Sequence, residues 1–291
     1  MTGAAASVSP VVVVGEFDGF HLGHRDLVDA ARVLATRLRS PVAAVVLDAQ
    51  ARAKVLSEPD VRCRSLIGAG VATAHVLEVP ADGVDAGALV DRVIRHTSPA
   101  MVVMSCPPEE RTEVQYPSLF SWFEIRGILV IEVPRRVDVT GETVTAARVR
   151  AAVGSGWVDD AARLLGAPFG VEGTVVHGQQ LGRTIGFPTA NLDPPGRIVI
   201  PANGVYAARV SVGDDSWPAA VNIGTRPTVD DRGRIVVEAH LLGFDADLYG
   251  RRIRIDFLQR LRDERRFESL DELTSQLARD VGHVRRLVDT R

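Results

Sequence analysis

A short segment in the second half of the chain combines side chains that suit a nucleotide and its metal ion. Residues 178–192 read GQQLGRTIGFPTANL. Gly182 and Gly186 would let backbone N–H groups approach phosphate oxygens closely, and Mg²⁺ accepts hydroxyl and amide oxygens alongside water and phosphate. Thr189 and Asn191 supply such oxygens at alternate positions, so they point to one side if the segment is extended. The segment predicts a phosphate and magnesium site, against the alternative of an ordinary turn that leads into a strand.

Two charged residues lie in segments that also have an ordinary structural reading. In VVEAHLL (236–242), an alternating strand would place Glu238 as the outward residue of an edge. Arg183 could contact a phosphate or remain a surface charge, and the sequence favours neither reading.

The first half of the chain contains a second motif that is compatible with a nucleotide, GEFDGFHLGH (15–24). It follows the apolar run VVVV (11–14) and would deliver His21 and His24 to the start of a helix. The helix start offers N–H donors and partial positive charge to a triphosphate. A His-x-x-His pair is weak support by itself, and a structural turn with capping histidines is the alternative.

The patterns around the first motif predict an α/β domain. Apolar runs alternate with helix-like stretches, as in VVVV (11–14), HRDLVDAARVLATRL (24–38), PVAAVVL (41–47) and ALVDRVIRHT (88–97). Strands that alternate with helical segments of this length indicate crossover units and a parallel sheet.

The second half of the chain changes character. From residue 171 on, β-rich runs separated by Gly, Asp and Pro turns predict a small antiparallel β-barrel. Residues 269–288 then form an amphipathic pattern that closes the chain as a helix, with Ser269 as its N-cap and Glu272 completing a capping box. We therefore expect two domains, 1–166 and 167–291.

Seven short motifs follow one another through the second domain. They are GTVVHG (173–178), GRTIGFPTANL (182–192), NGVYAARV (203–210), VNIGTRPT (221–228), VEAHLL (237–242), DLYG (247–250) and FLQRLRDERRF (257–267). In this order they resemble the riboflavin kinase domain at the C-terminal end of bacterial bifunctional riboflavin kinase/FAD synthetases. The resemblance implies an enzyme that uses ATP and Mg²⁺ to phosphorylate riboflavin, its substrate, to FMN, its product.

The resemblance also implies roles for individual residues. Thr189 and Asn191 would bind the ATP–Mg²⁺ complex, and Glu238 would act as the base. The candidate ATP-binding residues are Gly178, Gly182, Arg183, Gly186, Thr189 and Asn191, of which Thr189 and Asn191 are also the candidate metal ligands. The candidates for the flavin ring are apolar or planar: Leu261, Arg262 and Phe267. Phe267 could instead anchor the terminal helix, and we expect Gly204 and residues 222–228 to shape the barrel rather than touch the reacting atoms.

The first motif resembles the HxGH signature of nucleotidylyltransferases, in the form found in the FAD synthetase module. This implies a Rossmann-like domain in which His21 and His24 contact ATP phosphates, with Arg148 as a further candidate. The family's other elements are altered here: its FDPHP-like segment appears as LDAQA (47–51), its Gly-x-x-Phe-x-Phe-Gly loop as SCPPEERTEV (105–114) and its Ser-Ser-Thr-x-Ile-Arg pattern as VTAARVR (144–150). Since one preorganised donor is typically worth about 10²–10³-fold in rate, we expect FAD synthetase activity to be lost or weak.

Other interpretations of the first domain remain open. The chain could still be bifunctional through substitute residues, or could transfer a different nucleotide to a different acceptor. The domain could also bind a nucleotide or flavin as a sensor without catalysis, or serve only as an interaction or stabilising domain.

Composition limits the other partners. The chain has 291 residues and a formal net charge of −3, with no basic tail or charge block, which gives no support to a nucleic-acid partner. No apolar run is long enough to predict a membrane span, and two cysteines provide neither a disulfide framework nor zinc-type spacing. We expect a soluble cytoplasmic protein that acts on small molecules, while its oligomeric state is not determined by the sequence.

Overall fold

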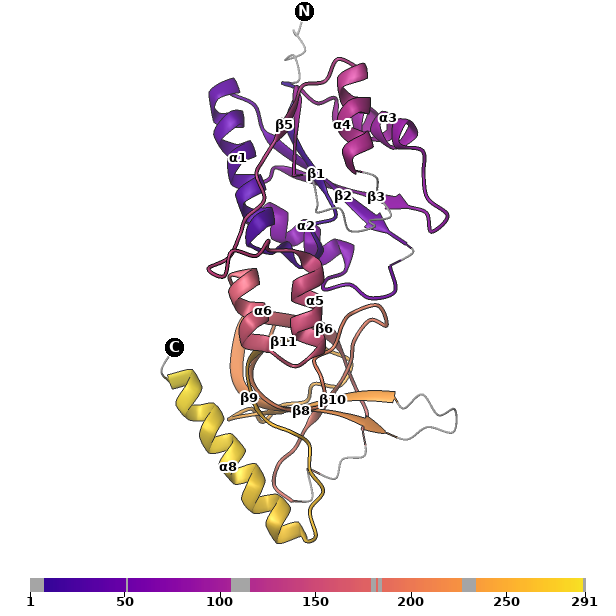
Figure 1. The fold of residues 1–291 in the computed structure, drawn as a ribbon. Helices are drawn as coiled ribbons and strands as arrows, with labels where there is room; N and C mark the ends of the chain where they lie inside the picture. The colour runs from indigo at the N-terminus through magenta and orange to yellow at the C-terminus, as the bar shows by residue number, and fades with distance from the viewer. Residues whose placement is uncertain are drawn as a thin grey trace, which may run out of the picture. The chain divides into compact units, whose positions relative to one another are not determined.

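The computed structural model describes residues 8–50, 52–105, 116–178, 182, 185–226 and 234–289. The chain divides into two compact units, Met1–Ala146 and Ala147–Arg291 (Figure 1). The expected boundary between residues 166 and 167 differs from this division only by two helices, α5 (Ala146–Gly154) and α6 (Val158–Leu165). As a boundary between functional domains, the expected division remains a prediction.

The first unit is built on a parallel five-stranded sheet with the strand order β3-β2-β1-β4-β5. Its strands are β1 (Val11–Gly15), β2 (Val42–Ala49), β3 (Thr73–Val79), β4 (Met101–Met104) and β5 (Val130–Glu132). Its helices are the short η1 (Asp18–Phe20), α1 (Leu22–Leu38), α2 (Pro59–Gly68), α3 (Ala86–Thr97) and α4 (Tyr116–Ile125). The predicted α/β class and parallel sheet are confirmed.

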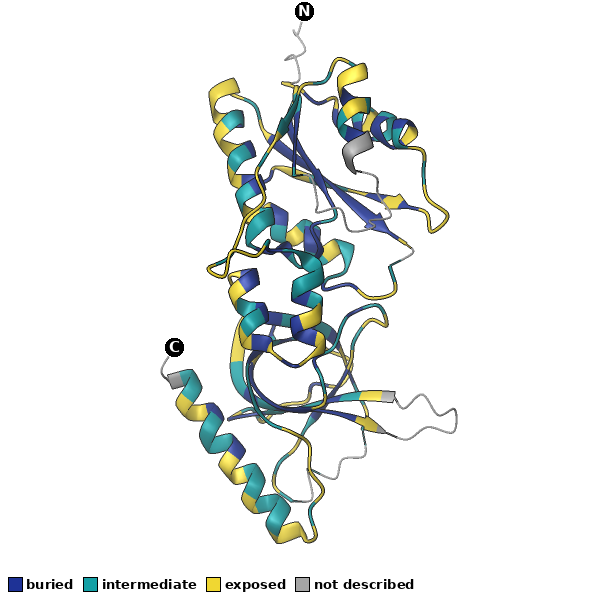
Figure 2. Ribbon diagram, viewed as in Figure 1, coloured by how far each residue is buried: buried dark blue, intermediate teal, exposed yellow. Residues whose placement is uncertain are grey.

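Both faces of this sheet are covered by helices, which explains why the central strands are almost continuously apolar, with Asp48 near the end of β2 as the exception. In β1, Val12 and Val14 pack in one core with α3 and α4, whereas Val11 and Val13 pack in the other core with α1 and α2. All five residues of β1 and all eight of β2 are buried (Figure 2). Continuous valine-rich strands are expected in a parallel sheet that is buried on two sides.

The second unit contains a closed six-stranded barrel with the order β10-β7-β6-β11-β8-β9, in which neighbouring strands pair antiparallel. The strands are β6 (Phe169–Val176), β7 (Ala190–Asp193), β8 (Gly204–Val212), β9 (Asp215–Arg226), β10 (Arg234–Leu241) and β11 (Arg252–Arg262). The predicted antiparallel barrel is confirmed. Its closure places β10 between β7 and β9, which is the arrangement on which the candidate site depends.

The terminal helix α8 (Leu270–Asp289) packs on the barrel through a small apolar cluster that contains Ala207, Leu242 and Val284. Ser269 caps it as expected, because its Oγ accepts a hydrogen bond from the Glu272 backbone N–H at 3.2 Å. The Glu272 carboxylate accepts from the backbone N–H of Glu268, one residue before the cap. The helix is therefore fixed at its start by the capping contact and along its length by apolar packing.

Candidate functional site

Three polar side chains form a row across neighbouring strands of the barrel. Glu238 on β10 is the register partner of Asn191 on β7 and also of Asn222 on β9. Side chains of directly paired residues lie on the same face of a sheet, so these three project to one side. Asn191 is only 7% exposed. The structure therefore joins Asn191 and Glu238, as the sequence predicted, and adds Asn222, which we had expected only to shape the barrel.

Glu238 lines a cavity of about 300 Å³ between the barrel and α8. Thr189, Asn222, Arg262 and Phe267 also line it, and the helix contributes apolar residues such as Leu277. A mainly apolar hollow with a few convergent polar groups is the usual form of a small-molecule site. Two of the three flavin candidates, Arg262 and Phe267, thus share a cavity with the candidate base. The third, Leu261, packs with the apolar cluster under α8.

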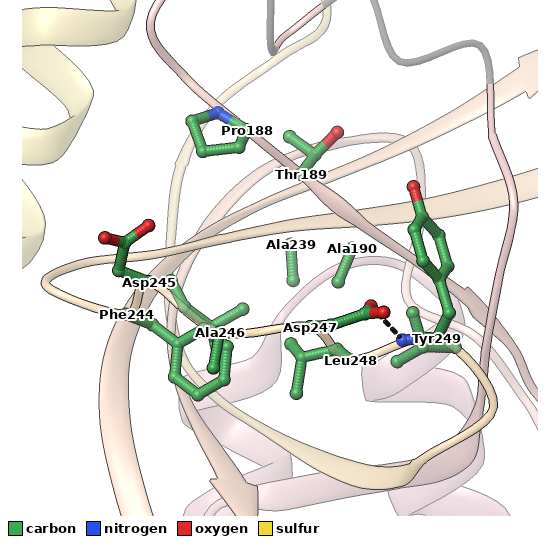
Figure 3. A pocket seen from close by; sticks show the side chains of 12 residues that line it. Pro188, Thr189, Ala190, Ala239, Phe244, Asp245, Ala246, Asp247, Leu248 and Tyr249 are labelled. Atoms are coloured by element: carbon green, nitrogen blue, oxygen red, sulfur yellow. Dashed lines mark hydrogen bonds between the residues drawn. The ribbon is translucent and has the colours of Figure 1, made fainter.

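A second cavity, of about 460 Å³, is also lined by Thr189 (Figure 3). Its walls come from residues 188–190 and 244–249, together with Val175, Ala239 and Leu241 from the barrel strands. The Asp247 carboxylate accepts a hydrogen bond from the Tyr249 backbone N–H at 2.9 Å, which fixes the second segment locally. Thr189 borders both cavities, whereas Glu238 lines only the one beside α8.

The glycines near Thr189 are needed for close packing. A Cβ atom on Gly178 would lie 2.2 Å from the Asn191 Nδ2 atom, and one on Gly182 would lie 2.2 Å from the Phe187 carbonyl oxygen. That carbonyl belongs to a turn in which the Phe187 backbone N–H donates to the Gly182 carbonyl at 2.8 Å. Gly186 has a φ of +82°, which favours glycine. Arg183 lies outside the described residues.

The first motif of the chain forms a turn between β1 and α1, and buried charged side chains stabilise this turn. Asp18 is fully buried, and its Oδ1 accepts from the backbone N–H groups of Leu56 at 2.8 Å and Ser57 at 3.1 Å. The buried Arg62 guanidinium on α2 forms ion pairs with Asp18 at 3.4 Å and with Asp48 at 3.7 Å. These contacts fix the turn, in which Phe17 and Phe20 adopt left-handed conformations.

His21 and His24 lie together at the start of α1. Their rings stack with centroids 3.7 Å apart, and His21 is the N-cap residue of the helix. Burial lowers the pKa of His24 well below its usual value, and the neighbouring His21 and Arg62 lower this pKa further. His24 is therefore neutral near pH 7 and can offer a ligand one ring N–H at most. The two predicted histidines are thus brought together at a helix N-terminus.

The structure describes the three altered elements of the FAD synthetase-like pattern to different extents. Asp48, near the end of β2, accepts a hydrogen bond from Gln50 Nε2 at 2.7 Å. Gln50 of the LDAQA segment is therefore bound to the carboxylate that pairs with Arg62. Residues 106–114 of the second altered element lie outside the described residues. Arg148 lies on α5 in the second compact unit, and its expected role remains a prediction.

Comparison with known proteins identifies the chain. A family model for riboflavin kinase matches residues 165–288, and one for FAD synthetase matches residues 4–78. A bifunctional riboflavin kinase/FMN adenylyltransferase from Pseudomonas fluorescens is 33% identical over 295 residues, which cover 95% of this chain and 92% of that protein. The chain belongs to this bifunctional family. The Escherichia coli K12 member is 49% identical over 141 residues, covering 48% of this chain and 44% of that protein.

A solved structure described as a macrolide-efflux protein from Streptococcus pneumoniae has the same fold over nearly the whole length. It superposes with a TM-score of 0.83 at 30% identity and covers 97% of this chain and 95% of that chain. The predicted family, fold and enzyme class, riboflavin kinase, are therefore confirmed. In this family ATP and riboflavin are the substrates, Mg²⁺ is the metal and FMN is the product.

The FAD synthetase match ends at residue 78. It includes GEFDGFHLGH (15–24) and the altered LDAQA (47–51), and it stops before the other two altered elements, at 105–114 and 144–150.

Among the described residues, no helix combines the length and apolar character that crossing a membrane requires.

Proposed function

We propose that the second unit of this bifunctional-family member transfers the γ-phosphate of ATP to the terminal ribityl hydroxyl of riboflavin. The observation that carries this proposal is the position of Thr189, which borders two cavities, only one of which contains Glu238. The cavity beside α8 would hold the flavin, and the cavity in Figure 3 would hold the nucleoside of ATP. The phosphates would then meet the hydroxyl near Thr189.

In this arrangement Glu238 orients the terminal hydroxyl and accepts its proton as the oxygen attacks the γ-phosphorus. The bond from the γ-phosphorus to its bridging oxygen breaks, and ADP leaves. Asn191 and Asn222 flank Glu238 in the row across the three strands. Phosphoryl transfer depends mostly on positioning and charge stabilisation, and a general base contributes less.

The residues around Thr189 fit a magnesium ion that arrives with ATP. Within the part of the chain that the structure describes, no three His, Cys, Asp or Glu side chains cluster so that they could hold a metal. Mg²⁺ usually keeps several waters and substrate phosphates and needs few protein ligands. The Thr189 hydroxyl and the Asn191 amide oxygen, with Gly178 making room for the amide, would complete such a shell. When bound, the ion neutralises charge that develops on the phosphate oxygens.

We further propose that the first unit retains a nucleotide-binding turn but transfers adenylyl groups weakly. The buried Asp18–Arg62 contact and the stacked histidines support the retained turn. The altered LDAQA, in which Gln50 is bound to Asp48, supports the weak activity. A fully active bifunctional enzyme remains the alternative, and the cytoplasmic location and the lack of a nucleic-acid partner remain predictions.

Chromatographic separation of flavins tests both proposals. The purified full chain is incubated with ATP and Mg²⁺, in one reaction with riboflavin and in another with FMN. We expect FMN to accumulate in the first reaction and little FAD to form in either. FAD in both reactions would restore the fully bifunctional reading, and unreacted riboflavin would contradict the roles of Thr189, Asn191 and Glu238.

A further inference from the structure

Each of the three guanidinium nitrogens of Arg262, the last residue of β11, has a protein partner. Its Nε lies 3.1 Å and its Nη2 2.8 Å from Oδ2 of Asp280 on α8. Its Nη1 donates to the Asp263 carbonyl oxygen at 2.9 Å. A guanidinium group binds carboxylates and phosphates through in-plane N–H groups, and all three of its nitrogens already have protein partners here.

A guanidinium with one edge paired to a carboxylate can still present a flat face to a ligand. These faces stack on planar aromatic groups, an interaction that lysine does not reproduce. The surroundings of Arg262 suit such a use, because Val205, Leu277 and Phe267 line the same cavity. The Arg262 Cζ lies over the Phe267 ring, 5.8 Å from its centroid. Arg262 is therefore better arranged to meet a flat ring than to bind a phosphate.

Asp280 determines this arrangement from the helix. Its side chain is 6% exposed, and it also accepts a hydrogen bond from Gln276 Nε2 at 2.8 Å. A carboxylate that is buried, paired along one edge of a guanidinium and supported by a third residue fixes the plane of that guanidinium. Removing one partner of such a pair leaves a buried charge without compensation. Neither Asp280 nor Gln276 was among the residues that we predicted from the sequence.

We propose that Asp280 is a positioning residue for flavin recognition, acting through Arg262. It holds the guanidinium so that a face, and not an N–H edge, meets the isoalloxazine ring. This inference rests on the proposed function, because it takes the cavity beside α8 as the flavin site. It also assigns α8 a part in binding, since the orientation of the Arg262 guanidinium on β11 depends on a side chain of the helix.

A double-mutant cycle on the full chain tests this coupling. The probe is lumiflavin, which has the flavin ring without the ribityl chain, and its Kd is measured by fluorescence quenching. We expect Asp280→Asn to weaken lumiflavin binding about tenfold, the order of one desolvated cation–π contact. In the Arg262→Met background the same substitution should cause no further loss. An equal loss in both backgrounds, or no loss in either, overturns the proposal.

Two further variants separate positioning from folding. Val284→Ala weakens the apolar packing of α8 away from the cavity and should lower Tm without changing the lumiflavin Kd. Asp280→Glu retains the charge but moves the carboxylate, so it should weaken lumiflavin binding even if Asp280→Asn does not fold. If Val284→Ala weakens binding as much as the Asp280 variants do, the effect belongs to helix packing and the proposal fails.

Steady-state kinetics distinguishes this inference from the proposed function. We expect Asp280→Asn to raise KM for riboflavin about tenfold while kcat changes little, because ring binding precedes the chemical step. A wild-type chain that does not phosphorylate riboflavin would contradict the proposed function. A wild-type chain that does so, with a variant KM that is unchanged, would contradict only the role of Asp280.

Discussion

Strand register, and not the local sequence, determines which polar residues lie beside Glu238. This glutamate faces Asn191 on one side and Asn222 on the other, and both are strand asparagines, which strands normally disfavour. A polar residue in an unfavourable position is retained only when other contacts or functions support it. The asparagine in VNIGTRPT was therefore a usable signal for a site residue, although we read that motif as structural.

At this scale we predict that Glu238→Gln lowers kcat by about 10²–10⁴-fold, the usual contribution of a general base. The amide is nearly the same shape as the carboxylate, so KM for riboflavin and for ATP should change little. Steady-state kinetics with separated flavins measures both parameters. Asp215→Asn, at the exposed start of β9, is the matched control and should retain wild-type kcat. A full-rate Glu238→Gln enzyme would remove the base from the mechanism.

His24 allows a prediction about pH. Its pKa is lowered in the folded chain by burial, by His21 and by Arg62, so below the unfolded value of about 6.5 the unfolded chain binds the extra proton more readily. Stability should be fully present above that pH and should decrease as the pH falls, by at most about 1.4 kcal/mol per pH unit for this one group. His24→Gln should flatten the dependence measured by urea unfolding between pH 7.5 and 5. His96→Gln, at an exposed position on α3, serves as the control variant.

At the scale of elements, the turn between β1 and α1 depends on a helix that follows it in the chain. Arg62 on α2 donates from Nε to the Ser57 carbonyl at 2.8 Å and from Nη1 to the Glu16 carbonyl at 3.2 Å, in addition to its ion pairs. One side chain thus connects α2, the loop before it and the residue that follows β1. This contact set explains how the turn keeps its shape while LDAQA departs from the family pattern.

We predict that Arg62→Met lowers the free energy of unfolding of the first unit by about 3–5 kcal/mol, because Asp18 and Asp48 lose a buried partner. Arg64→Met is the control on the same helix. Its ion pair with Asp60 is half exposed and should be worth about 1 kcal/mol or less. Denaturant unfolding followed by circular dichroism compares the two variants. Equal midpoints would show that the buried charges do not stabilise the turn.

At the scale of the whole molecule, the chain consists of two units with separate cores. The first unit has two apolar layers on either side of a parallel sheet, and the second has a closed barrel with α8 packed against it. The two cavities that share Thr189 lie entirely in the second unit. The kinase chemistry that we propose therefore needs residues from the second unit alone.

This organisation predicts where riboflavin protects the chain. At a riboflavin concentration of about 100 times Kd, binding should stabilise the native state by about 2.7 kcal/mol. Hydrogen exchange followed by mass spectrometry should show slower exchange in β8–β11 and α8, with no change in β1–β4. Equal protection in both units would mean that they unfold together or that the first unit also binds riboflavin.

Local sequence was sufficient to predict the main elements, and it also supplied the candidates for the site. The run of valines in β1 predicts a strand because both faces of a parallel sheet are buried, and Ser269 predicts a helix start because its hydroxyl can satisfy a backbone N–H. Thr189 and Asn191 are two residues apart, so strand geometry predicts a shared side if the segment is extended. These inferences need only the backbone periodicity of a short segment.

Only the tertiary structure decided which distant residues meet. Barrel closure sets β10 between β7 and β9 and thereby places Glu238 between Asn191 and Asn222, and the packing of α8 brings Asp280 to Arg262. Register and helix docking result from many weak contacts summed over the whole unit, and no short segment contains that information. The sequence by itself determined the family, the fold class and the chemical types at the site, whereas long-range packing determined their neighbours.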